Sequence, residues 1–182
     1  MIKFILSYFL FFGYIITKEH PVNPQILIQT NKFNTGIIMT QFVYPALLTA
    51  DEKDGGFVVT FPDLPEAITQ GNSWEEALHE AADCLEEAIA LRIDDKLEIP
   101  QPSQPKNQEY LVAVPAQTAI KAALYLAMRE KGISKVQLAS TLNIHEKEVR
   151  RILDPHHATK LSTMERTLGV LGQRIELQIT AK

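Results

Sequence analysis

The sequence predicts an α+β protein in two parts: a mixed domain over residues 39–115 and a helical domain over residues 116–182. One observation is a change in the sign of the charge. Residues 39–100 carry 14 acidic and three basic side chains, whereas residues 121–174 carry ten basic and five acidic ones. A second is that strand-like stretches are confined mainly to the first part, while helical spacing fills most of the second. A third is a group of four prolines between residues 100 and 115, which is typical of a connector.

The first 38 residues form an extension with a different composition. Lys3 precedes an apolar stretch from Phe4 to Ile16, which is shorter than the roughly 20 residues that a membrane-spanning helix needs. A signal peptide fits the charge and the apolar stretch, but residues 17–20 offer no small-residue cleavage site. The interpretation that we favour places the true start of translation at Met39, because the organised patterns begin just after it.

The single cysteine indicates the cellular compartment, and the two oppositely charged parts indicate the kinds of partner. Cys84 has no second cysteine to pair with, which fits a reducing cytosol, and its place in a helical pattern predicts a structural thiol. An acidic surface attracts a cationic protein, and a basic surface attracts a polyanion. We therefore expect a cytoplasmic protein with two kinds of partner, and no membrane partner.

The acidic part is predicted to contain three strands, a helix and a last strand. Asp54-Gly55-Gly56 separates two stretches rich in β-branched and aromatic residues, which is typical of a hairpin turn. Pro62 and Pro65 end the second strand, because proline cannot donate to a ladder. The expected strands are residues 42–49, 57–61, 67–70 and 109–114.

The expected helix begins with a capping box formed by Ser73 and Glu76. Its apolar residues recur every three or four positions and predict one stripe that covers a sheet face: Trp74, Ala77, Leu78, Ala81, Ala82, Leu85, Ala88 and Ile89. The opposite side is acidic. This side is either a binding surface for a basic protein or simply a solvated helix face.

This order of elements resembles the HicB antitoxins of type II toxin–antitoxin systems. The motifs that carry the resemblance are Tyr44-Pro45-Ala46, Phe61-Pro62-Asp63-Leu64-Pro65, Thr69-Gln70-Gly71 and Glu76-Ala77. Glu66-Ala67 departs from the Gly-Cys pair of many members, which we interpret as a variation in the turn. The resemblance implies a reduced ribonuclease-H-like fold that silences a small basic, RNA-cleaving toxin of the HicA type. The candidate toxin-binding residues are Tyr44, Phe57, Phe61, Asp63, Glu80, Asp83 and Glu87.

A working nuclease is the least favoured alternative. A ribonuclease-H-type site needs several carboxylates that converge on paired metal ions. Asp51, Asp54 and Asp63 lie in or beside turns and Asp83 lies within a helix, so no spacing marks them as a cluster. We therefore expect no enzyme activity and no cofactor.

The basic part is predicted to be a helix-turn-helix domain. Helices are expected at residues 117–131, at 134–142, and from His145 or Glu146 to Leu153, with Gly132 ending the first and Asn143-Ile144 forming the tight turn. A second capping box, formed by Ser134 and Gln137, is expected to start the middle helix. Lys147, Arg150 and Arg151 lie on the outer face of the third helix, where arginine can contact guanine and lysine can contact phosphate. The candidate DNA-binding residues are Ser134, Gln137, His145, Glu146, Lys147, Arg150, Arg151, His157, Thr159 and Lys160.

The last segment contains a third expected capping box, Ser162 to Glu165, and a helix that ends at Gly172. The alternation in residues 174–179 predicts a half-buried strand with Ile175, Leu177 and Ile179 on one face, which we expect to pair with a second chain in a homodimer or higher oligomer. Packing of this strand on its own domain is the alternative. The histidines and Cys84 lack the short paired spacing of zinc ligands, so no metal is expected.

Residues 139–172 also look like the helix-turn-helix half of one branch of HicB antitoxins, and the resemblance continues to Ile179. In that branch the antitoxin represses its own operon. The sequence thus predicts an antitoxin and autorepressor whose partners are a toxin and operator DNA. The alternative is a helix-turn-helix transcription regulator whose acidic domain binds a protein other than a toxin.

Overall fold

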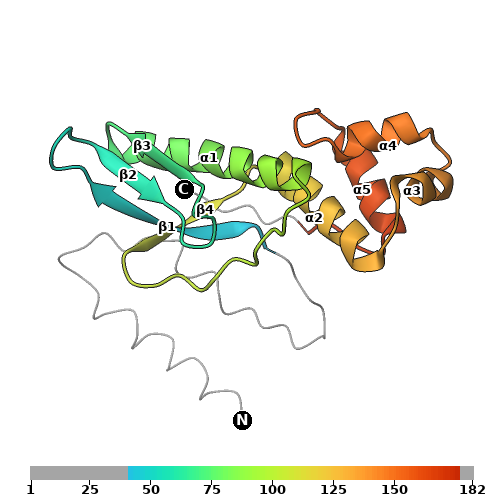
Figure 1. Cartoon of the computed structure of the whole chain (residues 1–182), viewed down its shortest axis with the longest axis horizontal. Helices are drawn as coiled ribbons and strands as arrows, with labels where there is room; N and C mark the ends of the chain where they lie inside the picture. The colour runs from blue at the N-terminus through green and yellow to red at the C-terminus, as the bar shows by residue number, and fades with distance from the viewer. Residues whose placement is uncertain (1–40, 177–182) are drawn as a thin grey trace, which may run out of the picture. The chain divides into compact units, whose positions relative to one another are not determined.

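The structure is a computed structural model that describes residues 41–176 (Figure 1). The predicted N-terminal extension and residues 177–182 lie outside these residues. The strands are β1 (Val43–Ala50), β2 (Phe57–Thr60), β3 (Ile68–Gly71) and β4 (Glu109–Ala113). The helices are α1 (Trp74–Asp94), α2 (Ala116–Lys131), α3 (Lys135–Leu142), α4 (Glu146–Leu153) and α5 (Leu161–Val170). The predicted α+β class and the order of these elements are confirmed.

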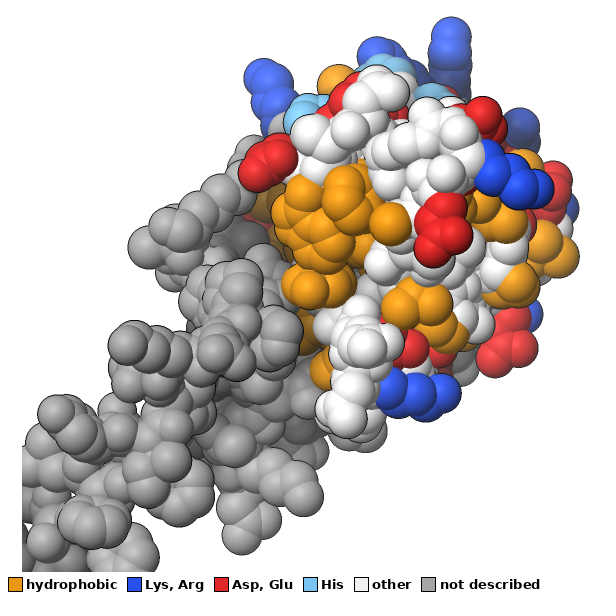
Figure 2. All heavy atoms as spheres, turned by 90° about the vertical axis from the view of Figure 1, so that its left-hand side faces the viewer, with side chains coloured by type: hydrophobic (Ala, Val, Ile, Leu, Met, Phe, Trp, Pro, Cys, Tyr) orange, Lys and Arg blue, Asp and Glu red, His pale blue; other side chains and the backbone are white. Residues whose placement is uncertain are grey.

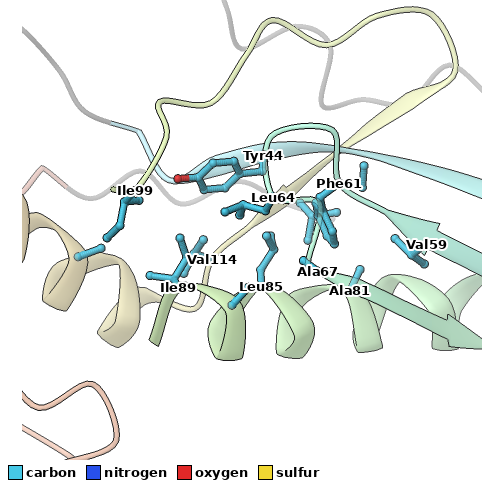
Figure 3. Close-up of a cluster of buried hydrophobic side chains, with 14 of the residues drawn as sticks. Tyr44, Val59, Phe61, Leu64, Ala67, Ala81, Leu85, Ile89, Ile99 and Val114 are labelled. Atoms are coloured by element: carbon cyan, nitrogen blue, oxygen red, sulfur yellow. The ribbon is translucent and has the colours of Figure 1, made fainter. Parts of the chain in front are cut away.

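The four strands form one antiparallel sheet in the order β3-β2-β1-β4 (Figure 1). Strand β1 pairs with β2 through the expected hairpin, with Leu47 opposite Thr60, and with β4 on its other side, with Leu47 opposite Glu109. The last strand therefore lies beside the first. Helix α1 packs against the sheet, and Figure 3 shows Leu85 and Ile89 directed from this helix toward Leu64 and Tyr44.

Two glycines permit close approaches of the backbone. Gly56 has a φ of 83°, and a Cβ atom there would lie 2.5 Å from the carbonyl oxygen of Gly71. A Cβ atom on Gly71 would lie 2.4 Å from the amide nitrogen of Ala77. Neither position can hold a side chain without moving the backbone, so these glycines set how closely the β1–β2 turn, β3 and α1 approach one another.

The start of α1 is capped nearly as predicted. The Ser73 hydroxyl accepts a hydrogen bond from the Glu76 amide at 3.2 Å. The Glu76 carboxylate accepts one from the amide of Asn72 at 3.0 Å, one residue earlier than in a regular capping box. The two side chains still satisfy two amides that have no partner within the helix.

The Glu66-Ala67 turn, where the sequence departs from the family pattern, is held by an ion pair. The Arg92 guanidinium donates to the Glu66 carboxylate, at 3.0 Å for one of the two contacts, and this hydrogen bond is the main reason why the pKa of Glu66 lies below its usual value. Ala67 is buried in the core beneath this turn.

The helical part has its own hydrophobic cluster, which is built from α2, α3, α4 and α5. Its buried residues include Ile120, Leu124 and Ala127 on α2 and Val149 and Ile152 on α4. Gly132 ends α2 with a φ of 62°, as expected for a glycine after a helix. The capping box of Ser134 and Gln137 at the start of α3 is also confirmed.

The predicted capping box at Ser162 is wrong. Helix α5 begins at Leu161, after an N-cap at Lys160, and no side chain caps it. The amides of Thr163 and Met164 both donate to the carbonyl oxygen of Lys160, so the first turn has already formed where Ser162 was expected to start the helix.

Only the first residues of the expected C-terminal strand lie in the described part. Residues 174–176 are not assigned to a strand, and Ile175 is half-buried against the helical cluster. Leu177 and Ile179 lie outside the described residues. Among residues 41–176, no helix is both long and apolar enough to cross a membrane.

Candidate functional site

The helix-turn-helix unit is formed by α3 and α4. Asn143 joins them in a left-handed conformation with a φ of 55°, and His145 is the N-cap of α4. Val149 and Ile152 are buried on the inner side of α4. Lys147, Arg150 and Arg151 are exposed on its other side, so the structure presents the three predicted cations to solvent together.

Arg150 is paired within its own helix. Its guanidinium donates to Glu146 one turn earlier, at 2.7 Å; the Arg150 side chain is largely open to solvent and that of Glu146 is partly exposed. An exposed pair of this spacing contributes about 0.3–0.5 kcal/mol, so DNA can displace it at little cost.

Arg151 is held by His157 in the loop that follows α4. Its guanidinium nitrogens lie 3.1 and 2.8 Å from Nε2 of the His157 ring. A guanidinium has only donors, so Nε2 accepts and the ring proton of the neutral histidine lies on Nδ1. This Nδ1 atom is buried, and no residue of the described part bonds to it. The loop histidine therefore fixes the direction of an arginine on the helix.

Three of the other predicted DNA-binding residues, His157, Thr159 and Lys160, border the same region. A groove of about 400 Å³ runs between α4 and the start of α5, and its lining includes Arg151, His157, Thr159 and Lys160. Ser134 and Gln137 lie at the start of α3, where the Gln137 side-chain oxygen accepts from the Ser134 amide at 2.8 Å. Gln137 thus contributes its amide oxygen to the helix cap.

The sequence interpretation missed Lys121, which is fully buried on α2. Its Nζ lies 2.8 Å from the carbonyl oxygen of Asp154, 3.0 Å from that of His157 and 2.8 Å from the Thr159 hydroxyl. Burial lowers the pKa of Lys121 to about 8, and the charge of Asp154 opposes this shift. A signal was present in the sequence, because Lys121 is the only charged residue between positions 116 and 128.

On the acidic part, three predicted toxin-binding residues share one side of α1. Glu80, Asp83 and Glu87 are exposed at spacings of three and four residues, and Asp83 lies 3.5 Å from His79. Helix α1 carries seven acidic residues and one arginine, Arg92, which is already paired with Glu66. The outer side of this helix is therefore strongly acidic.

The other four predicted toxin-binding residues lie elsewhere. Tyr44 and Phe61 are buried, at 0% and 2% exposure, so they support the core and offer no surface to a partner. The Tyr44 hydroxyl donates to the carbonyl oxygen of Pro100 at 2.8 Å, and burial, helped by the charge of Asp63, raises the pKa of Tyr44 to about 12. Phe57 packs edge-on against Trp74, and Asp63 accepts from the Ser103 amide at 2.9 Å.

Seen from the β1–β2 hairpin end, hydrophobic side chains reach the surface among charged ones of both signs (Figure 2). The exposed apolar residues of the sheet include Leu47 and Ile68, at 37% and 61%.

Among residues 41–176, no three His, Cys, Asp or Glu side chains lie together in a way that could hold a metal ion.

Comparisons with known proteins agree with this architecture. Residues 43–123 match the family described as the HicB-like antitoxin of bacterial toxin–antitoxin systems. The chain is 36% identical over 147 residues to antitoxin HicB 1 of Photorhabdus laumondii, covering 81% of this chain and 93% of that protein. It is 40% identical to antitoxin HicB 2 of the same organism over 134 residues, with 74% and 94% covered. Antitoxin HicB of Escherichia coli K12 is 34% identical over 134 residues, with 74% and 96% covered. The chain therefore belongs to the HicB family of antitoxins.

Proposed function

We propose that this chain binds and neutralises a HicA-type toxin through residues 39–115 and represses its own operon by binding operator DNA through residues 116–182. The observation that carries the proposal is the combination, in one HicB-family chain, of an acidic α1 face with an exposed cationic α4. Such surfaces suit a basic protein and DNA respectively.

Toxin binding is supported by the charge of α1. A toxin that cleaves RNA needs a surface that attracts phosphates, and Glu80, Asp83 and Glu87 can compete for that surface. The toxin is expected to be encoded by a short reading frame beside this gene. Its expression alone should arrest growth, and co-expression with this chain should restore growth and yield a complex that co-purifies.

Charge reversal tests which surface is responsible. The variant Glu80→Lys/Asp83→Lys/Glu87→Lys should lose growth rescue and co-purification, because like charges would then oppose each other across the interface. Glu165→Lys is the matched control, since Glu165 is also an exposed helical acid but lies on α5. If the triple variant rescued growth as well as the control does, this side of α1 would not be the toxin-binding surface.

Operator binding is supported by the exposed arginines of α4. Arg150→Ala and Arg151→Ala should each weaken operator binding by about 1–3 kcal/mol if each arginine contacts a guanine. Lys147→Ala should instead weaken binding to all DNA sequences and reduce its dependence on salt. Growth rescue should survive in all three variants. Unchanged operator affinity in an Arg150→Ala/Arg151→Ala double variant would exclude α4 as the recognition helix.

The alternative function, a transcription regulator whose acidic domain binds another protein, predicts a different outcome. Operator binding would remain, but the neighbouring reading frame would neither arrest growth nor co-purify with this chain.

A further inference from the structure

A buried lysine joins α2 to the end of the candidate recognition helix. Lys121 has no exposed surface, yet its side chain ends in an ammonium group. An ammonium group has three N–H donors. They match the three short contacts of Nζ, to the carbonyl oxygens of Asp154 and His157 and the hydroxyl of Thr159, while the carbonyl oxygen of Arg151 lies farther away at 3.4 Å.

These acceptors belong to the end of α4 and to the loop that follows it. The carbonyl groups of Arg151 and Asp154 lie at the C-terminal end of α4, where carbonyls have no partner within the helix and a cation is favourable. His157 and Thr159 belong to the loop. The amide of Thr159 also donates to the side chain of Gln117, at 3.2 Å, so a second residue of α2 holds the same loop.

The loop in turn holds Arg151. The His157 carbonyl bonds to Lys121, and the His157 ring accepts from the Arg151 guanidinium. Lys121 is thus connected to an exposed arginine of α4 through one loop residue, although it does not reach the surface itself.

We propose that Lys121 is a positioning residue for operator binding: its buried ammonium fixes the loop after α4 and so holds His157 against Arg151. This inference rests on the proposed operator-binding function. A buried cation is expensive to desolvate, and here three short hydrogen bonds to the end of α4 and its loop offset that cost. All of these contacts of Lys121 are made with the end of α4 and the loop that follows it, so the lysine acts on the position of that loop.

The test compares Lys121→Met with Lys131→Met in the full chain. Both variants remove one positive charge from α2, but Lys131 is exposed on its last turn. Lys121→Met should bind the chain's own promoter fragment at least about tenfold more weakly, which corresponds to about 1.4 kcal/mol. Lys131→Met should change binding by no more than about twofold. Growth rescue by both variants should remain that of the parent chain.

Two further readouts separate positioning from a general loss of structure. Lys121→Met leaves buried acceptors without a donor, so its midpoint of thermal unfolding should fall by a few degrees, and promoter binding is compared at a temperature where both variants are fully folded. Amide hydrogen exchange at residues 154–160 should become faster, while exchange in the other helices should stay that of the parent chain. In a chain that already carries Arg151→Ala, adding Lys121→Met should weaken promoter binding only about twofold further. The reason is that the effect of Lys121 passes through Arg151, so the two losses of binding are not additive.

Three outcomes would overturn the proposal. These are unchanged promoter binding in Lys121→Met, full additivity with Arg151→Ala, or unchanged exchange in the loop. If the parent chain does not bind its promoter, the proposed operator function fails and the positioning role in binding fails with it. The exchange measurement then shows separately whether Lys121 fixes the loop.

Discussion

Two polar residues of the described part, Tyr44 and Lys121, combine complete burial with a shifted pKa. In both cases burial disfavours the charged form, so it raises the pKa of the tyrosine and lowers that of the lysine. Tyr44 makes a single hydrogen bond to a carbonyl oxygen, as a neutral phenol should. Lys121 is surrounded by acceptors, which is the environment of an ammonium group, and at neutral pH it is mostly charged.

The pKa of Lys121 predicts how stability changes with pH. The group has a pKa of about 8 in the folded chain and about 10.4 when unfolded. Between these values the unfolded chain binds more protons, so the contribution of Lys121 to the free energy of unfolding rises with pH. In denaturant titrations at pH 7, 8.5 and 10, the free energy of unfolding of the parent chain should rise relative to that of Lys121→Met as the pH increases.

The groups around Lys121 decide whether its contribution to the free energy of unfolding rises or falls with pH. Asp154 favours the protonated lysine, whereas Arg151 and His157 turn their carbonyl oxygens toward it and direct their side chains toward each other. If the free energy of unfolding of Lys121→Met instead rose relative to that of the parent chain at higher pH, the acceptors would have raised the pKa of Lys121 above its value in the unfolded chain.

Residues differ in how far the sequence could predict their place. Lys147, Arg150 and Arg151 were predictable as exposed, because Val149 and Ile152 fix the buried side of a short helix. Tyr44 and Phe61 were expected at an interface but are buried, because both aromatic side chains lie in the core between the sheet and α1 (Figure 3). The link between Lys121 and the loop depends on a contact over more than 30 positions, which no local pattern encodes.

At the scale of elements, the strongest local signals predicted the structure best. The hairpin glycines, the caps at Ser73 and Ser134 and the glycine at position 132 all lie where expected. The pattern from Ser162 to Glu165 failed because it competes with an earlier helix start at Leu161, beside the loop held by Lys121. A capping motif identifies a possible helix start, but tertiary contacts select among neighbouring starts.

The turn between α3 and α4 provides a test at this scale. Asn143 has a left-handed conformation, which costs most residues other than glycine and asparagine about 1–2 kcal/mol. Asn143→Ala should lower the free energy of unfolding by about 1 kcal/mol in a denaturant titration, whereas Asn143→Gly should leave it nearly unchanged. Equal losses in the two variants would mean that the Asn143 side chain, and not its backbone conformation, stabilises the turn.

At the scale of the whole molecule, α2 connects the two hydrophobic clusters. Ala122 is buried in the cluster beneath the sheet, whereas Ile120 and Leu124 are buried in the helical one. The Thr118 hydroxyl donates to Glu86 of α1 at 2.6 Å. The predicted domain boundary at residue 115 falls directly before this helix, although α2 contributes residues to both clusters.

The C-terminal segment is the part of the chain through which we expect two copies to associate. We propose that Ile175, Leu177 and Ile179 lie on one face of a strand that pairs with a second chain, since an edge strand is otherwise left open. The pairing would bring two α4 helices together around a two-fold axis, to bind half-sites about one helical turn apart. Ile175 is half-buried against its own helical cluster, which is also what the alternative of packing within one chain requires.

The variant Leu177→Asp distinguishes these two arrangements, because a charge on the apolar face would oppose strand pairing. We expect it to be monomeric by sedimentation analysis, to bind operator DNA much more weakly and to retain growth rescue. Val170→Asp is the matched control, since Val170 is a partly exposed apolar residue of α5 outside the proposed strand. It should remain dimeric and protect both half-sites in a footprint. If Leu177→Asp also remained dimeric and protected both half-sites, residues 174–180 would not form the dimer interface.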